Sequence, residues 1–169
     1  MVKMERLRLA AFRGVPGELQ LDFTSPLTII YAPNGTGKSS LVDAAEWLLT
    51  GEVKRVRDFS KKNNDSELRC KFAPVENRME VEGWFLQGEG PFRLVRVPDA
   101  WLMSREGDEA PRRTTSREVM KLFAPNEFGK ERDYRVAPGL ERDWIRSARF
   151  LTVSTLALLV DTESENQTT

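Results

Sequence analysis

The sequence predicts an α/β fold built around a phosphate-binding loop, and three consecutive features support this prediction. The first is the continuous apolar run from Leu27 to Ala32, which is typical of a strand covered on both faces. The second is the segment "APNGTGKS" at 32–39, which fits the pattern G-x-x-x-x-G-K-[ST] except for Ala32 at the first glycine. The third is an amphipathic helix directly after the loop. At 169 residues and 40% hydrophobic composition, the chain suits one domain with a real core.

Two strands are expected before the apolar run. In residues 5–12 and 17–23, leucine and phenylalanine alternate with charged and polar side chains. Such alternation indicates strands with one solvated face. The intervening segment at 14–18 has the composition of a hairpin turn.

The helix after the loop is defined by one apolar stripe. Its members recur at helical spacing, and they are Leu41, Ala44, Ala45, Leu48 and Leu49. Gly51 supplies the expected stop. Residues 52–65 are polar and basic, which predicts a surface loop.

The middle of the chain reads as β-rich. Three more strands are expected at 67–72, 79–86 and 91–97, giving a small β-layer or the edge of a mixed sheet. Residues 99–115 read as a loop. Thr115 and Glu118 have the spacing of a capping box, so a short helix is expected to begin there.

Composition narrows the possible chemistry. Lys plus Arg and Asp plus Glu both number 26, so binding to nucleic acid would need a local basic surface. The chain has no histidine, the usual metal ligand and general base. Its one cysteine, Cys70, excludes an internal disulfide and fits a reducing compartment. With neither a signal peptide nor a membrane-length apolar run, we expect a cytoplasmic protein with no membrane contact.

Each motif position of the loop has a physical role. Gly35 and Gly37 allow backbone N–H groups to turn toward phosphates, and the following helix N-terminus adds to this anion site. Lys38 supplies a positive charge for the β- and γ-phosphates, and the Ser39 hydroxyl is suited to ligate Mg²⁺. The sequence therefore predicts binding of ATP with Mg²⁺.

The residues on either side of the phosphate loop indicate a protein family more specifically than the loop alone. A first strand ending in "FRG", a hairpin, and then "LTIIYAPNGTGKSSLVDAAEWLLTG" together resemble the SMC, RecF and RecN group of ABC-type ATPase heads. These proteins act in DNA repair and chromosome organisation, with relatives in anti-phage defence. The resemblance is sharpest over residues 4–51. It implies the N-terminal lobe of an incomplete head, with an ATP sandwich formed by two heads.

The resemblance also implies site residues and partners. The loop positions Pro33, Asn34, Gly35, Thr36, Gly37, Lys38, Ser39 and Ser40 would bind the nucleotide, with Lys38 and Ser39 taking part in catalysis. Arg13 would lie near the nucleotide, and Arg55 or Arg57 would reach the nucleotide or DNA. The arginines at 55 and 57 also fit an ordinary solvated surface. Implied partners are a C-terminal ATPase lobe or a second head, DNA, and a nuclease or accessory subunit.

Two parts of such a head are not visible in the sequence. A glutamine that ligates Mg²⁺ is expected near 152–154, where Thr152 and Ser154 stand instead. The run 156–161 ends in Asp161, which would hold Mg²⁺ if the run is a Walker B strand, with Glu163 near the attacking water. The same run also fits a helix, because short apolar runs cannot be typed by periodicity.

These features lead to one division of the chain and three candidate functions. Residues 1–160 form the predicted ATPase lobe, and 161–169 form a polar tail. Within the lobe lie the phosphate loop at 32–39, a β-rich insert at 66–97 and a helical segment at 115–160. The favoured function is a head lobe whose ATPase activity is weak alone and needs a C-terminal lobe or partner. The alternatives are a non-catalytic nucleotide-binding module and a small phosphotransferase.

Overall fold

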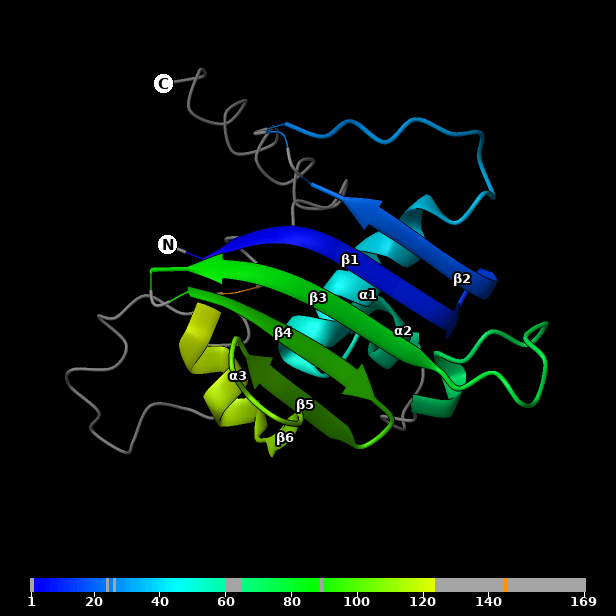
Figure 1. Ribbon diagram of the computed structural model, residues 1–169. Coiled ribbons are helices and arrows are strands. Elements are labelled where there is room, and N and C mark those ends of the chain that lie inside the picture. The colour runs from blue at the N-terminus through cyan, green and yellow to red at the C-terminus, as the bar shows by residue number, and fades with distance from the viewer. Residues whose placement is uncertain are drawn as a thin grey trace, which may run out of the picture.

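A six-stranded antiparallel sheet dominates the computed structural model (Figure 1). The structure describes residues 2–23, 25, 27–59, 65–88, 90–123 and 145, with the backbone alone at 57–59. The strands are ordered β2-β1-β3-β4-β5-β6 across the sheet. Their bounds are β1 Lys3–Phe12, β2 Val15–Asp22, β3 Glu80–Gln87, β4 Gly90–Val97, β5 Ala100–Arg105 and β6 Arg112–Thr114. All pairings among the described strands are antiparallel, so the predicted mixed character has no counterpart in this part of the chain.

Both strands predicted before the phosphate loop are formed, and the predicted alternation of buried and solvated residues is confirmed for β1, whereas Leu19 on β2 is 36% exposed. Leu7 and Leu9 are buried on one face of β1, whereas Arg8 lies on the opposite face. The Arg8 guanidinium donates to Glu18 at 2.7 Å and to Glu80 and Glu82 at 2.8 Å, which joins β2, β1 and β3. The bonds to Glu18 and Glu80, above all the one to Glu18, raise the pKa of Arg8, and the bond from Arg8 lowers the pKa of Glu18.

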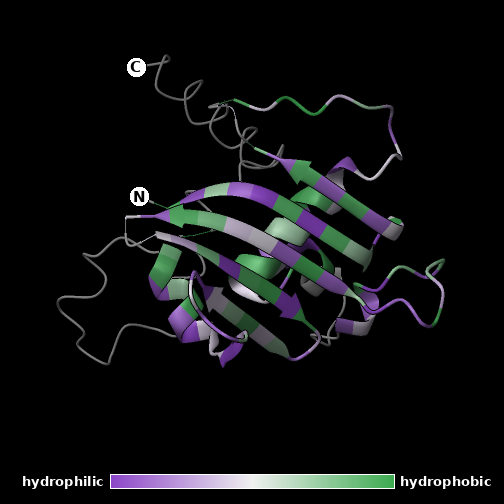
Figure 2. Cartoon of the chain, in the orientation of Figure 1, coloured by the Kyte–Doolittle hydropathy of each residue, from purple (hydrophilic) through white to green (hydrophobic). Residues whose placement is uncertain are grey.

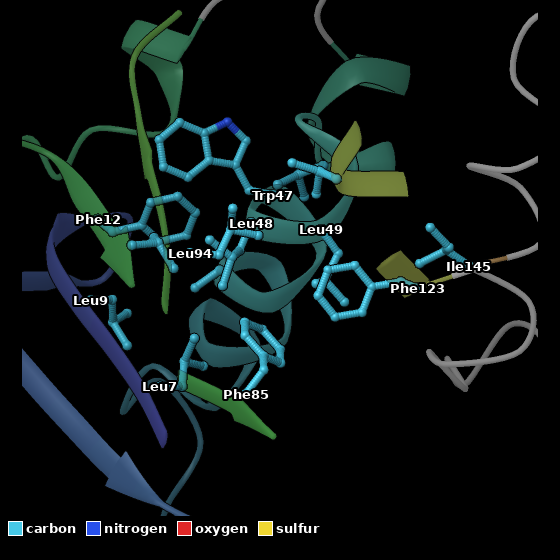
Figure 3. Close-up of a cluster of buried hydrophobic side chains, with 14 of the residues drawn as sticks. Leu7, Leu9, Phe12, Trp47, Leu48, Leu49, Phe85, Leu94, Phe123 and Ile145 are labelled. Atoms are coloured by element: carbon cyan, nitrogen blue, oxygen red, sulfur yellow. The ribbon is translucent and has the colours of Figure 1, made fainter. Parts of the chain in front are cut away.

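Helix α1, Lys38–Thr50, covers the apolar face of the sheet (Figure 1). Trp47 and Leu48 are fully buried, and the Trp47 ring lies 5.4 Å from the ring of Phe12 on β1 (Figure 3). A second aromatic group joins Phe85 and Phe92 to Phe123. The predicted stripe of α1 is confirmed, because its leucines and Ala44 are buried and Gly51 ends the helix.

The expected buried strand at 27–32 is not formed. This segment has no regular structure and runs as an extended trace beyond the β2 edge of the sheet (Figure 1). Leu27, Ile29 and Tyr31 are 75%, 81% and 93% exposed, and Figure 2 shows hydrophobic residues along this trace. A strand covered on both faces needs neighbouring strands and two covering layers. The described residues provide neither for this segment.

Four other local predictions differ from the structure. The loop expected at 52–65 contains a short helix α2, Lys54–Phe59, and its last residue begins a 3₁₀ turn η1, Asp65–Glu67. The strand expected at 67–72 is a turn with one isolated bridge, between Phe12 and Arg69. The loop expected at 99–115 contains β5 and β6. The hairpin turn expected at 14–18 is shorter, because β2 already begins at Val15.

The last described helix begins as the capping box predicts. Helix α3 spans Ser116–Phe123. The Glu118 carboxylate accepts hydrogen bonds from the Thr115 backbone N–H at 2.9 Å and from the Thr115 hydroxyl at 3.0 Å, and the Thr115 hydroxyl accepts from the Glu118 N–H at 3.3 Å. Across the described ranges, no helix has the length and apolar character needed to span a membrane.

Candidate nucleotide-binding site

The phosphate loop turns into helix α1 through two glycines in the left-handed region. Gly35 has φ 86° and Gly37 has φ 95°, and Gly37 is the N-cap of α1. Left-handed backbone is readily available only to glycine, which explains both positions. The Thr36 hydroxyl closes the turn by donating to the Pro33 carbonyl at 2.8 Å. The helix N-terminus that follows favours a bound anion through its unpaired N–H groups.

Lys38 is held against its own loop in this structure. Its ammonium donates to the Pro33 carbonyl at 2.6 Å and also to the Ala32 carbonyl. Both acceptors are neutral, so a phosphate group can replace them with a stronger, charge-assisted contact. The side chain is therefore positioned at the loop and remains able to exchange partners.

A cavity of about 620 Å³ opens beside the loop. Four of the residues that line it are basic, Arg13, Lys38, Arg69 and Lys71, and one is acidic, Glu67. This excess of positive charge suits a polyphosphate. Its size falls within the range of ordinary small-ligand pockets, about 300–1,000 Å³. The remaining lining residues are Gly14, Asn34, Gly35, Gly37, Ser39, Ser40 and Phe72.

The two serines at the start of α1 have different environments. Ser40 is buried, and its hydroxyl accepts a hydrogen bond from the Gly14 N–H at 3.2 Å. This bond joins the β1–β2 turn to the first turn of α1. Ser39 is exposed and lines the cavity, so its hydroxyl is the one available to a metal ion accompanying phosphate.

Arg13 and Arg55 converge on one buried carboxylate. Asp43, 3% exposed on α1, lies 2.8 Å from Arg13 Nε and accepts hydrogen bonds from Arg55 Nε at 2.8 Å and Arg55 Nη2 at 2.5 Å. The bonds to Asp43 raise the pKa of Arg55. Arg13, which has φ 46°, also lines the cavity, whereas Arg55 does not. The structure thus places Arg13 at the cavity beside the phosphate loop and Arg55 in an ion pair with Asp43.

Several predicted residues fall elsewhere. Pro33 and Thr36 shape the loop but do not line the cavity. The Arg57 side chain, Asp161 and the candidates at 152, 154 and 163 lie outside what the structure describes. Within the described residues there is no group of three or more Cys, Asp and Glu side chains suited to hold a metal ion. The cavity fits a nucleotide polyphosphate, and the described chain offers the Ser39 hydroxyl to an accompanying Mg²⁺.

Sequence reasoning missed one wall of this cavity. Glu67, Arg69, Lys71 and Phe72 line it, although the sequence predicts an ordinary strand for this segment. The only signal of this segment in the sequence is one basic residue on each side of Cys70, followed by an aromatic residue. That pattern also fits an alternating strand, so only the folded chain brings the segment to the phosphate loop.

Comparison with known proteins gives the family. An AAA domain family model matches residues 6–130. The C subunit of the nuclease SbcCD from Vibrio cholerae is 30% identical over 121 residues, covering 69% of this chain and 12% of that protein. The chromosome partition protein Smc of Bacillus subtilis is 26% identical over 136 residues, covering 76% of this chain and 11% of that protein.

A solved structure has the same fold. It comes from work on ATP-driven dimerization and DNA-stimulated activation of SMC ATPases, and it matches with a TM-score of 0.52 at 21% identity, covering 94% of this chain and 97% of that one. The chain spans only about a tenth of the length of the two curated relatives. The chain therefore belongs to the AAA domain family, as an N-terminal lobe of an ABC ATPase head of the SMC/RecF type.

Proposed function

We propose that this chain is the ATP-binding lobe of an SMC-like ATPase that couples ATP binding and hydrolysis at a head dimer to engagement of DNA. The observation that carries the proposal is the glycine-rich loop at the N-terminus of α1, which borders a cavity lined by four basic side chains. The relatives bear the names of a chromosome partition protein, a nuclease subunit and a DNA repair protein. We extend a role in DNA repair to this chain, and anti-phage defence is the alternative role that its sequence resemblance implies.

Each role follows from the position of a residue. The backbone at Asn34, Gly35 and Gly37 borders the cavity and would donate N–H groups to the phosphates. Lys38 would leave its loop carbonyls for the β- and γ-phosphates. Ser39 is the residue we assign to Mg²⁺, which neutralises phosphate charge when bound.

Arg13 can exchange its ion pair with Asp43 for a contact with a phosphate. Its guanidinium lies between the cavity and Asp43, and Asp43 has Arg55 as a second cation. If Arg13 turns to a phosphate, the buried carboxylate keeps one positive partner. The large cost of an unpaired buried charge is thereby avoided.

The lobe needs a partner to complete the site. Among the described residues, Glu67 is the one carboxylate that lines the cavity. The exposed segment from Leu27 to Tyr31 offers an apolar surface for another part of the head. We assign this surface to a C-terminal ATPase lobe, which would also supply the acidic residues for hydrolysis, with a second head closing over the nucleotide. A nuclease or accessory subunit would act on the assembled head.

The test is ATP binding and hydrolysis with matched lysine variants. The chain should bind ATP with Mg²⁺ in calorimetry, and Lys38→Ala should lose this binding. Lys121→Ala, an exposed lysine on α3 outside the cavity, should retain it. Phosphate release should stay low for the chain alone, rise when a C-terminal lobe is added, and rise further with duplex DNA.

Different failures point to different conclusions. Equal ATP binding by wild type and Lys38→Ala would contradict the assignment of the site. Normal binding with background hydrolysis in the presence of the partner lobe would favour a non-catalytic nucleotide-binding module. Phosphate transfer to a nucleoside monophosphate by the chain alone would favour a small phosphotransferase.

A further inference from the structure

The wall that faces the phosphate loop across the cavity is a loop running from Arg69 to Asn77, called here the 69–77 loop. It follows η1 and leads into β3 (the green loop at the right of Figure 1). Within it, Phe72 is 88% exposed and lines the cavity, whereas Val75 is 94% exposed and does not. The position of Phe72 therefore requires an explanation beyond general exposure of the loop.

The 69–77 loop is held firmly, so Phe72 projects from a fixed support. The Arg69 guanidinium donates to the Asn77 carbonyl at 2.9 Å and to the Pro74 carbonyl at 2.7 Å. The Cys70 N–H donates to the Ala11 carbonyl on β1 at 2.9 Å, and the thiol is buried. A preorganised loop that presents an aromatic ring loses little entropy when a ligand contacts that ring.

The same support connects the loop to the phosphate side. The Arg13 N–H donates to the Leu68 carbonyl at 2.7 Å, and Leu68 is buried directly before the loop. Arg13 and Lys38 line the cavity on the side of the phosphate loop, Arg69 and Lys71 line it beside Phe72, and Phe72 is the one aromatic residue among the described residues that line it. The cavity thus offers both cationic side chains and an exposed aromatic ring, and these groups suit the phosphates and the base of a nucleotide.

We propose that Phe72 is the stacking surface for the nucleobase of the bound nucleotide, with the phosphates at the Lys38 end. This inference rests on the proposed function, because it places the base of the nucleotide whose phosphates bind the loop. Stacking on an aromatic ring tolerates any base, since every base has a π-face. Phe72 would therefore add affinity for a nucleoside over a bare polyphosphate.

The test compares ATP with inorganic tripolyphosphate by calorimetry on the full chain with Mg²⁺. Loss of one base–aromatic stack corresponds to an affinity loss of about fivefold or more. Phe72→Ala should weaken ATP binding by that factor and leave tripolyphosphate binding unchanged. Phe72→Tyr, which retains the ring, should bind ATP like wild type. Val75→Ala is the matched control, because Val75 is equally exposed on the same loop but lies outside the cavity.

The two proposals fail in different ways. Unchanged ATP binding in Phe72→Ala, or an equal loss for ATP and tripolyphosphate, would overturn the stacking role while Lys38-dependent binding stood. A similar loss in Val75→Ala would also overturn it, because the loop would then act as a whole. If tripolyphosphate binding by wild type does not depend on Lys38, the proposed function itself is wrong. Thermal melts should be unchanged, because Phe72 buries almost nothing.

Discussion

Gly51 allows one structural contact to be tested by a single added methyl group. It is the C-cap of α1, with φ 79°, and its N–H donates to the Trp47 carbonyl at 2.8 Å. A Cβ at this position would lie 2.4 Å from Cη2 and 2.7 Å from Cζ2 of Trp101. Gly51→Ala therefore adds two costs, a left-handed backbone for a residue with a Cβ and a collision with an indole ring.

The indole has few ways to move aside. Its Nε1 donates to the Leu48 carbonyl at 2.7 Å, and the Arg96 guanidinium lies 4.0 Å from its centroid. Arg96 is itself buried, and its guanidinium lies 5.0 Å from the ring centroid of Trp47. The left-handed backbone costs about 1–2 kcal/mol for alanine. Overpacking adds about 1–3 kcal/mol, so we expect a loss of about 2–5 kcal/mol.

A matched glycine separates the two costs. Gly107 has φ 91°, but a Cβ there would meet nothing within 4 Å. Gly107→Ala should therefore lose only the backbone part, about 1–2 kcal/mol. Urea unfolding followed by tryptophan fluorescence gives both values. Equal losses for the two variants would refute a fixed Trp101 ring. In a Trp101→Ala background the cost of Gly51→Ala should fall to that of Gly107→Ala.

Two further predictions concern charged groups. Asp43→Asn should lower the free energy of unfolding by about 1–3 kcal/mol, because the buried carboxylate loses its charge-assisted hydrogen bonds from Arg55 and its ion pair with Arg13, and both arginines are partly solvated. Asp22→Asn, which breaks an exposed pair with Arg6, should cost less than about 1 kcal/mol; similar losses in urea unfolding would contradict the special role of Asp43. Hydrogen bonds from the backbone of Thr115 and from neighbouring hydroxyls lower the pKa of Glu118 from its ordinary 4.5. Its stabilising contribution is complete above that value and is lost as the pH falls through the lowered pKa. Glu118→Gln should therefore melt earlier than wild type at neutral pH, and the difference should shrink progressively as the pH falls below 4.5. A melting difference that persists in acid would show that the ionised carboxylate is not the capping group.

Local sequence patterns predicted the helices and strands whose apolar residues are buried against other parts of this chain. The stripe of α1, the alternation of β1 and the capping box of α3 all depend on residues within a few positions of each other. The strand β5 was missed because Ala100–Arg105 lacks alternation and leads into a charged run. Its place in the sheet comes from pairing with β4 and from Trp101, which contacts the end of α1 from 53 residues away. Such contacts leave no signature in a short window of sequence.

The candidate site likewise has one part that the sequence predicts and one part that it does not. The phosphate loop can be identified from sequence because Gly35, Gly37, Lys38 and Ser39 are consecutive or nearly so, and each position has its own chemical requirement. The wall formed by residues 67–72 cannot, because it is placed by the isolated bridge from Arg69 to Phe12 and the backbone bond from Cys70 to Ala11, and both contacts join it to the distant strand β1. Phe72 therefore reaches the cavity through long-range backbone contacts to β1 and through the Arg69 bonds that hold its loop.

The segment from Leu27 to Tyr31 differs from both cases. Its composition is that of a buried strand, yet the described chain leaves Leu27 75% and Tyr31 93% exposed. The composition of a segment indicates the surroundings in which that segment is stable. Large exposed apolar runs typically mark interaction sites. Helix α1, only seven residues further on, buries most of its apolar stripe against β1, β3, β4 and α3, so weak folding of the region does not account for the exposure. The disagreement between pattern and burial is therefore best explained by a surface that another part of the head covers, which is the arrangement that the proposed ATPase requires.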